Sequence, residues 1–239
     1  MKYFLTLFLW MSLTTVVNAQ IIKLATLFPE GTRTAEILKT FSKNVENKTS
    51  GRVKFKIYFG GAQGDEADVL RKMHIGQLHG GIFTGRTLSE VNGDIRVMEL
   101  PFNFKQNLAK GLQVLNKMVP FFNKGIEKNG YKSLGIFELG PIYLGSVKKA
   151  GQIKELAGIK IWSWEGDPLV ATIIENMGFV SVPLPLPEVL PSLSTGLVEA
   201  AYGPPGAMVA LQWSNKFKYL FDLPISYSVG AFLVVQKEW

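Results

Sequence analysis

Side chains able to do chemistry are few and scattered in this sequence. Its two histidines, His74 and His79, are five residues apart, which is not a spacing that aligns two imidazoles on a helix for one metal ion. The chain has no cysteine, and it contains neither a G-x-S-x-G nucleophile motif nor a phosphate-binding glycine loop with its lysine. Carboxylates could form an acid pair, but nothing indicates that two converge; the candidates are Glu99, Glu138, Glu165 and Asp167. The sequence therefore predicts no catalytic residue, no metal site and no cofactor, and it gives an enzyme no support.

Aromatic side chains, by contrast, stand at the ends of predicted strands in residues 156–205. Residues 159–164 alternate with the period of two that is typical of a strand, and Asp167 followed by Pro168 predicts the start of a helix. The pattern continues as strand, helix, strand, which is typical of a parallel α/β domain. Ligands of such sheets bind beyond the carboxyl ends of the strands. Three residues at two of these ends are therefore candidate ligand contacts: Trp164, Tyr202 and Pro204.

Two segments of the N-terminal half supply further candidates. The apolar run 21–28 predicts a buried strand, and the loop after it leads into a helix capped by Thr32 or Thr34. The free N–H groups of such a helix start favour anionic or carbonyl ligand atoms, although an ordinary turn explains the loop equally well. The glycines of the strand HGGIFTG fit either a ligand close to the backbone or tight helix packing. The candidates from these segments are Phe28, Arg33, Phe83, Thr84 and Arg86.

The clearest helical pattern follows, and it leads to a predicted passage between two domains. Apolar residues recur at spacings of four and three, at Leu108, Leu112, Leu115, Val119, Phe122 and Ile126. Pro120 lies inside this helix and is expected to kink it. Two strands are then predicted, KSLGIFELG and PIYLGSVKK, joined by Gly140 and Pro141.

The composition is that of a folded protein with a substantial core, with 239 residues of which 47% are hydrophobic and 19% charged. The net charge of +7 comes from scattered basic residues, so we expect no nucleic-acid partner. Residues 1–19 combine Lys2, a short apolar run and small residues before Ala19, which predicts a signal peptide cleaved after Ala19. The run is short for a membrane span. The sequence thus predicts a soluble periplasmic protein.

Four motifs, taken together and in this order, resemble one known family. They are GRVKFKIYFGGAQGDEADVLRKMHIGQLHGGIFTG, ELPFNF, LAGIKIWSWEGDP and PLPLPEVLPSLSTGLVEAAYGPP. With them, the chain from Ile21 to Trp239 resembles the periplasmic solute-binding subunits of TRAP transporters, the DctP family. The resemblance implies an α/β fold of two lobes, like that of type II periplasmic binding proteins, with mixed sheets flanked by helices and hinge strands between the lobes.

The resemblance also implies domain boundaries and partners. Lobe I would comprise residues 20–140 and 224–239, and lobe II residues 141–223, while the C-terminal bracing helices of relatives would be absent. A small-molecule ligand would bind in the cleft between the lobes and be delivered to TRAP membrane permease subunits that use an ion gradient. A ligand-sensing or adaptor protein with the same fold is the alternative.

Departures from the family pattern bear on the ligand. The family usually has an arginine that pairs with the ligand's carboxylate where this chain has Trp162, and tryptophan cannot make that bidentate contact. An acidic residue and an asparagine are often found where this chain has Tyr202 and Gly203 before its proline. We therefore expect a cleft that is more aromatic, with Trp213 also lining it, and a ligand more apolar than a C4-dicarboxylate.

Two alternatives stay open at this point. The aromatic residues could instead fill the core, where such side chains are common. Arg33 or Arg86 could also replace the missing arginine, and the ligand would then be an organic acid. An aromatic residue at position 162 also occurs in members associated with tetratricopeptide-repeat proteins, which makes such a protein a further candidate partner.

Overall fold

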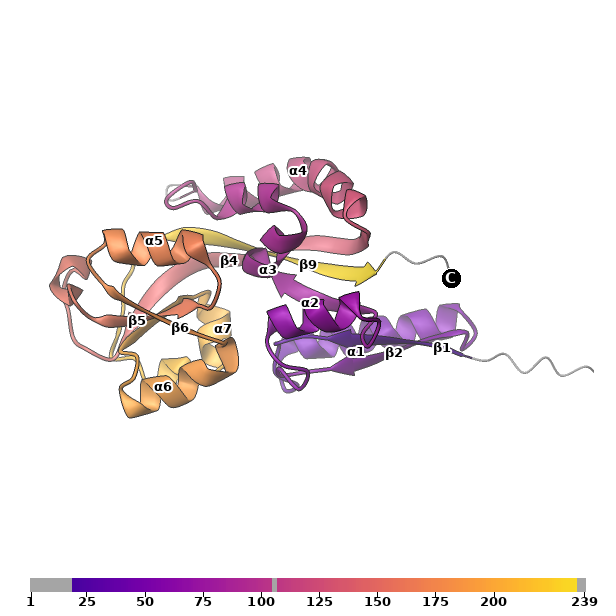
Figure 1. Cartoon of the computed structure of the whole chain (residues 1–239), viewed down its shortest axis with the longest axis horizontal. Coiled ribbons are helices and arrows are strands. Elements are labelled where there is room, and N and C mark those ends of the chain that lie inside the picture. Colours follow the sequence, from indigo (N-terminus) through magenta and orange to yellow (C-terminus); the bar gives the residue numbers. More distant parts are fainter. Residues whose placement is uncertain (1–18, 105–106, 236–239) are drawn as a thin grey trace, which may run out of the picture.

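A computed structural model describes residues 19–104 and 107–235, so the predicted signal peptide lies outside the described residues except for Ala19. In this part of the chain nine strands form one mixed sheet flanked by helices (Figure 1). Eight of them follow the order β2-β1-β3-β9-β4-β7-β5-β6, and β8 pairs with β4 beside this path. We use lobe I for the described parts of 20–140 and 224–235, and lobe II for 141–223, which keeps the boundaries predicted from the sequence.

Lobe I begins with parallel strands whose connecting helices start at polar caps. β1 pairs in parallel with both β2 and β3, and β3 pairs antiparallel with β9. The side chain of Thr32 caps α1, and Asp65 forms a reciprocal capping box at the start of α2. The elements are β1 (Gln20–Ala25), α1 (Arg33–Lys48), β2 (Val53–Tyr58), α2 (Glu66–His74), β3 (Gly80–Thr84), α3 (Gly85–Val91), η1 (Gly93–Glu99) and α4 (Leu108–Lys128).

Lobe II also contains parallel strands joined by helices, and one of these helices starts at a polar cap. β5 pairs in parallel with β6 and β7, and Asp167 caps α5 with Pro168 in its first turn. The elements are η2 (Ile153–Leu156), β5 (Lys160–Trp164), α5 (Pro168–Asn176), β6 (Val180–Leu184), η3 (Leu186–Glu188), α6 (Val189–Thr195), β7 (Ala200–Gly203), α7 (Pro205–Ala210), η4 (Trp213–Asn215) and β8 (Tyr219–Leu220).

Two long antiparallel strands, β4 (Tyr131–Ser146) and β9 (Ser226–Val235), pair along most of their length (Figure 1). β4 runs from lobe I into lobe II, and β9 pairs with it on both sides of the predicted boundary. The sequence predicts two strands separated at Gly140 and Pro141, and this is wrong, because β4 is a single strand. The chain stays paired with β9 on both sides of an irregularity between Glu138 and Gly140, where Gly140 adopts a φ of 103°. The predicted lobe boundary at residue 140 therefore falls inside a strand, and the boundaries stay a prediction.

Among the described residues, buried apolar side chains gather in four clusters, two in each lobe. In lobe I, α4 packs Leu115, Phe122 and Ile126 into the core, as its spacing predicts. Leu112 of the same predicted stripe is exposed, however. The neighbouring Gly111 faces the core in its stead. A Cβ at Gly111 would lie 2.9 Å from the ring of Tyr227, so the backbone of α4 lies directly against that ring.

No helix of the described residues combines the length and the apolarity that crossing a bilayer requires.

Adjacent phenylalanines in α4 allow a matched test of this packing. Phe122 is 0% exposed and its neighbour Phe121 is 53% exposed. Replacing Phe122 by alanine should lower the free energy of unfolding by about 3–5 kcal/mol, because it leaves a cavity in the core. Replacing Phe121 by alanine should cost less than about 1 kcal/mol. Urea unfolding followed by circular dichroism measures both values, and similar losses would contradict the observed orientation of α4.

Candidate functional site

A cavity of about 860 Å³ lies between the two lobes and is lined by residues of both. All of the residues proposed from the sequence as ligand contacts line it: Phe28, Arg33, Phe83, Thr84, Arg86, Trp162, Trp164, Tyr202, Gly203, Pro204 and Trp213. The carboxyl ends of β3, β5 and β7 bring most of them together, which is where parallel strands present their loops. That each contacts a ligand stays a prediction.

Trp162 is the centre of an aromatic group on the lobe II side. Its ring stacks on Tyr202 with 4.9 Å between centroids, and its centroid is 5.3 Å from that of Trp213 and 5.5 Å from that of Trp164. The indole nitrogen donates a hydrogen bond to the carbonyl of Leu184. Trp162 is thus fully buried with its polar atom satisfied, and the less buried Trp164 and Tyr202 present more aromatic surface to the cavity.

Close packing surrounds the glycines of β3. A Cβ at Gly80 would lie 2.5 Å from the carbonyl oxygen of Leu233 in β9, and one at Gly81 would lie 2.7 Å from the ring of Phe83. Phe83 itself is buried in the core of lobe I. A Cβ at Gly81 would also lie 2.9 Å from Val69 of α2, so tight packing, one of the two interpretations that the sequence allowed, is sufficient to explain the glycines. Contact of this strand with a ligand stays a prediction.

The two arginines proposed to supply a positive charge differ in their surroundings. Arg33 has a side chain 85% exposed and pairs with Glu36. Arg86 is largely buried, pairs with Glu90 at 3.0 Å, and donates a hydrogen bond of 2.7 Å to the carbonyl of Glu165 in lobe II. Arg86 therefore joins the two lobes, while Arg33 stands at the solvent edge of the cavity.

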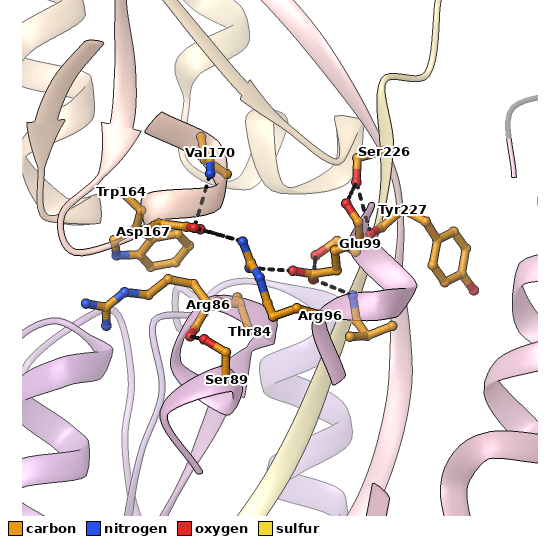
Figure 2. A network of polar contacts seen from close by, with 12 residues as sticks. Thr84, Arg86, Ser89, Arg96, Glu99, Trp164, Asp167, Val170, Ser226 and Tyr227 are labelled. Carbon is orange, nitrogen blue, oxygen red and sulfur yellow. Dashed lines mark hydrogen bonds and ion pairs between the residues drawn. The ribbon is translucent and has the colours of Figure 1, made fainter. Parts of the chain in front are cut away.

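A third arginine, Arg96 in η1, was missed by the sequence analysis. Its Nη1 lies 2.6 Å from Glu99, and its Nη2 donates to both carboxylate oxygens of Asp167, at 2.8 and 2.9 Å (Figure 2). The side chains of Arg96, Glu99 and Asp167 are 16%, 10% and 5% exposed. Two carboxylates do converge here, contrary to the expectation from sequence, because η1 of lobe I faces the start of α5. The i,i+3 spacing of Arg96 and Glu99 was the available signal.

Glu99 connects this network to the long strand β9. Its Oε1 accepts the backbone N–H of Val229, and its backbone carbonyl accepts the hydroxyl of Ser226 (Figure 2). A Cβ at Gly85 would lie 2.2 Å from the Glu99 carboxyl group, so only glycine fits there. Burial raises the pKa of Glu99 to about 7, while the nearby Arg96 charge acts in the opposite direction.

Three side chains of lobe I hold the turn between β5 and α5. Besides the contacts of Arg86 with Glu165 and of Arg96 with Asp167, the carboxylate of Asp65 accepts the indole N–H of Trp164 at 2.8 Å. We call these three contacts the interlobe clamp. Its lobe I members come from the N-cap of α2, from α3 and from η1, so three separate elements converge on one short turn.

Glu66, which no motif of the sequence indicated, is a further buried carboxyl group at the cavity, besides Glu99 and Asp167. It accepts hydrogen bonds from the backbone N–H and the hydroxyl of Thr84. Burial raises the pKa of Glu66 to about 8, against the lowering effect of these hydrogen bonds. Near neutral pH this carboxyl group is therefore mostly protonated and uncharged.

The architecture and the interlobe cavity agree with the family to which the sequence matches. The model of the DctP family, described as bacterial extracellular solute-binding protein, family 7, matches residues 24–239. The chain belongs to this family. The family and its solved members that resemble this chain are binding proteins rather than enzymes.

Similar sequences and structures support the same assignment. A solute-binding protein of Verminephrobacter eiseniae is 22% identical over 82% of this chain and 59% of its own length. Another, from Chromohalobacter salexigens, is 26% identical over 73% of this chain and 51% of its own length. The chain thus spans little more than half of these curated relatives.

Solved TRAP periplasmic solute-binding proteins share the fold. One from Sulfitobacter sp. NAS-14.1, with bound β-D-galacturonate, has a TM-score of 0.83 and 22% identity over 91% of this chain and 72% of its own. One from Desulfovibrio salexigens, with bound orotic acid, has a TM-score of 0.82 and 19% identity over 90% of this chain and 69% of its own.

The raised pKa of Glu66 predicts a pH-dependent stability. Between its usual value of 4.5 and its folded value of about 8, the folded state holds a proton that the unfolded chain has lost. The free energy of unfolding should therefore fall as pH rises from 5 to 8, by at most about 1.4 kcal/mol per pH unit for this group. Replacing Glu66 by glutamine, which is neutral throughout, should flatten the decline.

Urea titrations at several pH values measure this slope. Glu99 adds a decline of the same sign that both proteins share. Replacing the exposed Glu36 by glutamine is the matched control and should keep the wild-type slope. Equal slopes for the wild type and the Glu66→Gln variant would contradict the buried, protonated state.

Proposed function

We propose that this chain is an extracytoplasmic solute-binding protein that encloses a small organic ligand between its lobes. The interlobe cavity carries this proposal, since its volume of about 860 Å³ lies in the usual range for small-molecule sites. Residues of both lobes line it, so a ligand there would contact both lobes at once. The long strands β4 and β9 are the connections about which the lobes would move.

The ligand that we propose has a largely apolar surface. The aromatic group around Trp162 and many aliphatic side chains line the cavity. Its two mostly buried arginines, Arg86 and Arg96, already pair with carboxylates of the chain. The solved relatives carry acids, namely β-D-galacturonate and orotic acid, so an organic acid with Arg33 as its partner is the other ligand class.

Delivery of the ligand to the membrane subunits of a TRAP transporter is the second part of the proposal. Membership of the DctP family supports it. A signal peptide at residues 1–19, cleaved after Ala19, would bring the protein to the periplasm where such delivery takes place. A tetratricopeptide-repeat partner stays a prediction from the sequence alone.

Native mass spectrometry of the protein purified without denaturation tests the ligand class. We expect an apolar or aromatic small molecule to be bound. A sugar acid or dicarboxylate would overturn the apolar ligand and keep the binding function. If nothing co-purifies, thermal unfolding against matched panels of aromatic compounds and sugar acids decides between the two classes.

A variant that fills the cavity tests the location of the site. Ala207 of α7 lines the cavity, and phenylalanine there would occupy part of its volume. Ala207→Phe should weaken binding of the ligand found above at least about tenfold, as measured by calorimetry, because a filled site excludes the ligand. The matched control is Ala109→Phe, on the exposed surface of α4, which should bind normally. Unchanged affinity in a correctly folded Ala207→Phe variant would place the site elsewhere.

A further inference from the structure

Arg96 forms ion pairs with two carboxylates, although a single carboxylate would balance its charge. Glu99 comes from the same short helix, three residues along the chain. Asp167 comes from lobe II, across the cavity, and both of its oxygens accept from the same guanidinium nitrogen. The position that Asp167 occupies on Arg96 is the position that a carboxylate of a bound ligand would need for a charge-assisted pair.

Asp167 is held in this position by its own lobe. Its Oδ1 also accepts the N–H of Val170 as the cap of α5 (Figure 2), and its backbone N–H bonds to the carbonyl of Trp164. Its neighbour Glu165 is held by Arg86. A ligand that displaced Asp167 from Arg96 would leave a buried carboxylate without its cation, which is strongly unfavourable.

We propose that Asp167 determines the charge selectivity of the cavity, because its carboxylate occupies Arg96 and excludes ligand carboxylates from it. The cavity then favours an uncharged ligand over the carboxylate of the same shape. This inference rests on the proposed function, in that it requires a small organic molecule to bind between the lobes.

The acidic groups beside Arg96 act in the same direction, and the cation Arg33 stands apart from them at the solvent edge with a side chain 85% exposed. A ligand carboxylate beside Arg96 would be a third acidic group next to Glu99 and Asp167, and repulsion between like charges is strong where little water is present. The two terminal nitrogens of Arg86 are engaged by Glu90 and by the carbonyl of Glu165, while its buried Nε has no hydrogen-bond partner among the described residues. Arg86 therefore does not offer a ligand the paired nitrogens that a bidentate contact with a carboxylate requires.

Replacing Asp167 by asparagine removes the negative charge of this side chain and keeps nearly the same shape. Asparagine is an equally good N-cap, so α5 should form as before while Arg96 loses the negative charge of its partner across the cavity. The probes are indole-3-acetate and indole-3-acetamide, which have the same shape and differ in charge, and calorimetry measures their affinities. Asp167→Asn should bind indole-3-acetate about ten- to hundredfold more tightly than the wild type, with indole-3-acetamide changed less than about threefold.

Two control variants test whether the gain in affinity for indole-3-acetate depends on Arg96 and on the position of the charge that is removed. The double variant Arg96→Gln with Asp167→Asn should lose the gain, since no guanidinium remains. Asp94→Asn removes an exposed negative charge from the same short helix and should leave both affinities unchanged. Near-ultraviolet circular dichroism and thermal unfolding establish that each variant is folded.

The outcomes separate this inference from the function on which it rests. The charge selectivity is overturned if folded Asp167→Asn binds indole-3-acetate no more tightly than the wild type does, including the case in which neither protein binds it. It is also overturned if the double variant keeps the gain. The function itself is judged independently, by the co-purifying molecule and by the loss of its binding in Ala207→Phe.

Discussion

The pairing of β4 with β9 is the constraint on which the rest of the structure depends. β4 continues through both lobes, β9 pairs with it on both sides of the predicted boundary, and every other pairing of the sheet is built outward from these two strands. Their ladder fixes where η1, which is bonded to β9 through Glu99, stands relative to the start of α5. The cavity and the interlobe clamp therefore follow from the position of two strands more than from any single contact across the cleft.

The site combines an apolar wall with polar groups that mostly find partners within the chain; the buried Nε of Arg86 is an exception. Trp162 is enclosed by aromatic neighbours, and its indole N–H has a backbone partner. Arg96 is enclosed by two carboxylates. Both positions illustrate the rule that buried polar groups need partners, met here by residues of the protein. The surface of the cavity is mainly apolar.

Features of this protein that depend on neighbours in sequence were predictable, and features that depend on the placement of the lobes were not. The caps at Thr32 and Asp167 and the alternation in β5 act within one element, and sequence spacing reveals them. The pair of Arg96 and Asp167 joins positions 71 residues apart, so no local pattern contains it. The continuity of β4 was likewise hidden, because Gly140 and Pro141 are typical of a turn, and only the partner strand β9 shows that the ladder continues.

The order of the strands leaves β2 and β6 at the two margins of the sheet, each with one row of backbone groups that no strand of this sheet covers. Along β2, Lys54 and Lys56 alternate with apolar residues, and β6 contains Pro183, which has no N–H to donate. Charged side chains and proline on marginal strands discourage a second chain from adding itself to the sheet. A protein with so many strands in one sheet is thereby protected at both margins from association through its backbone.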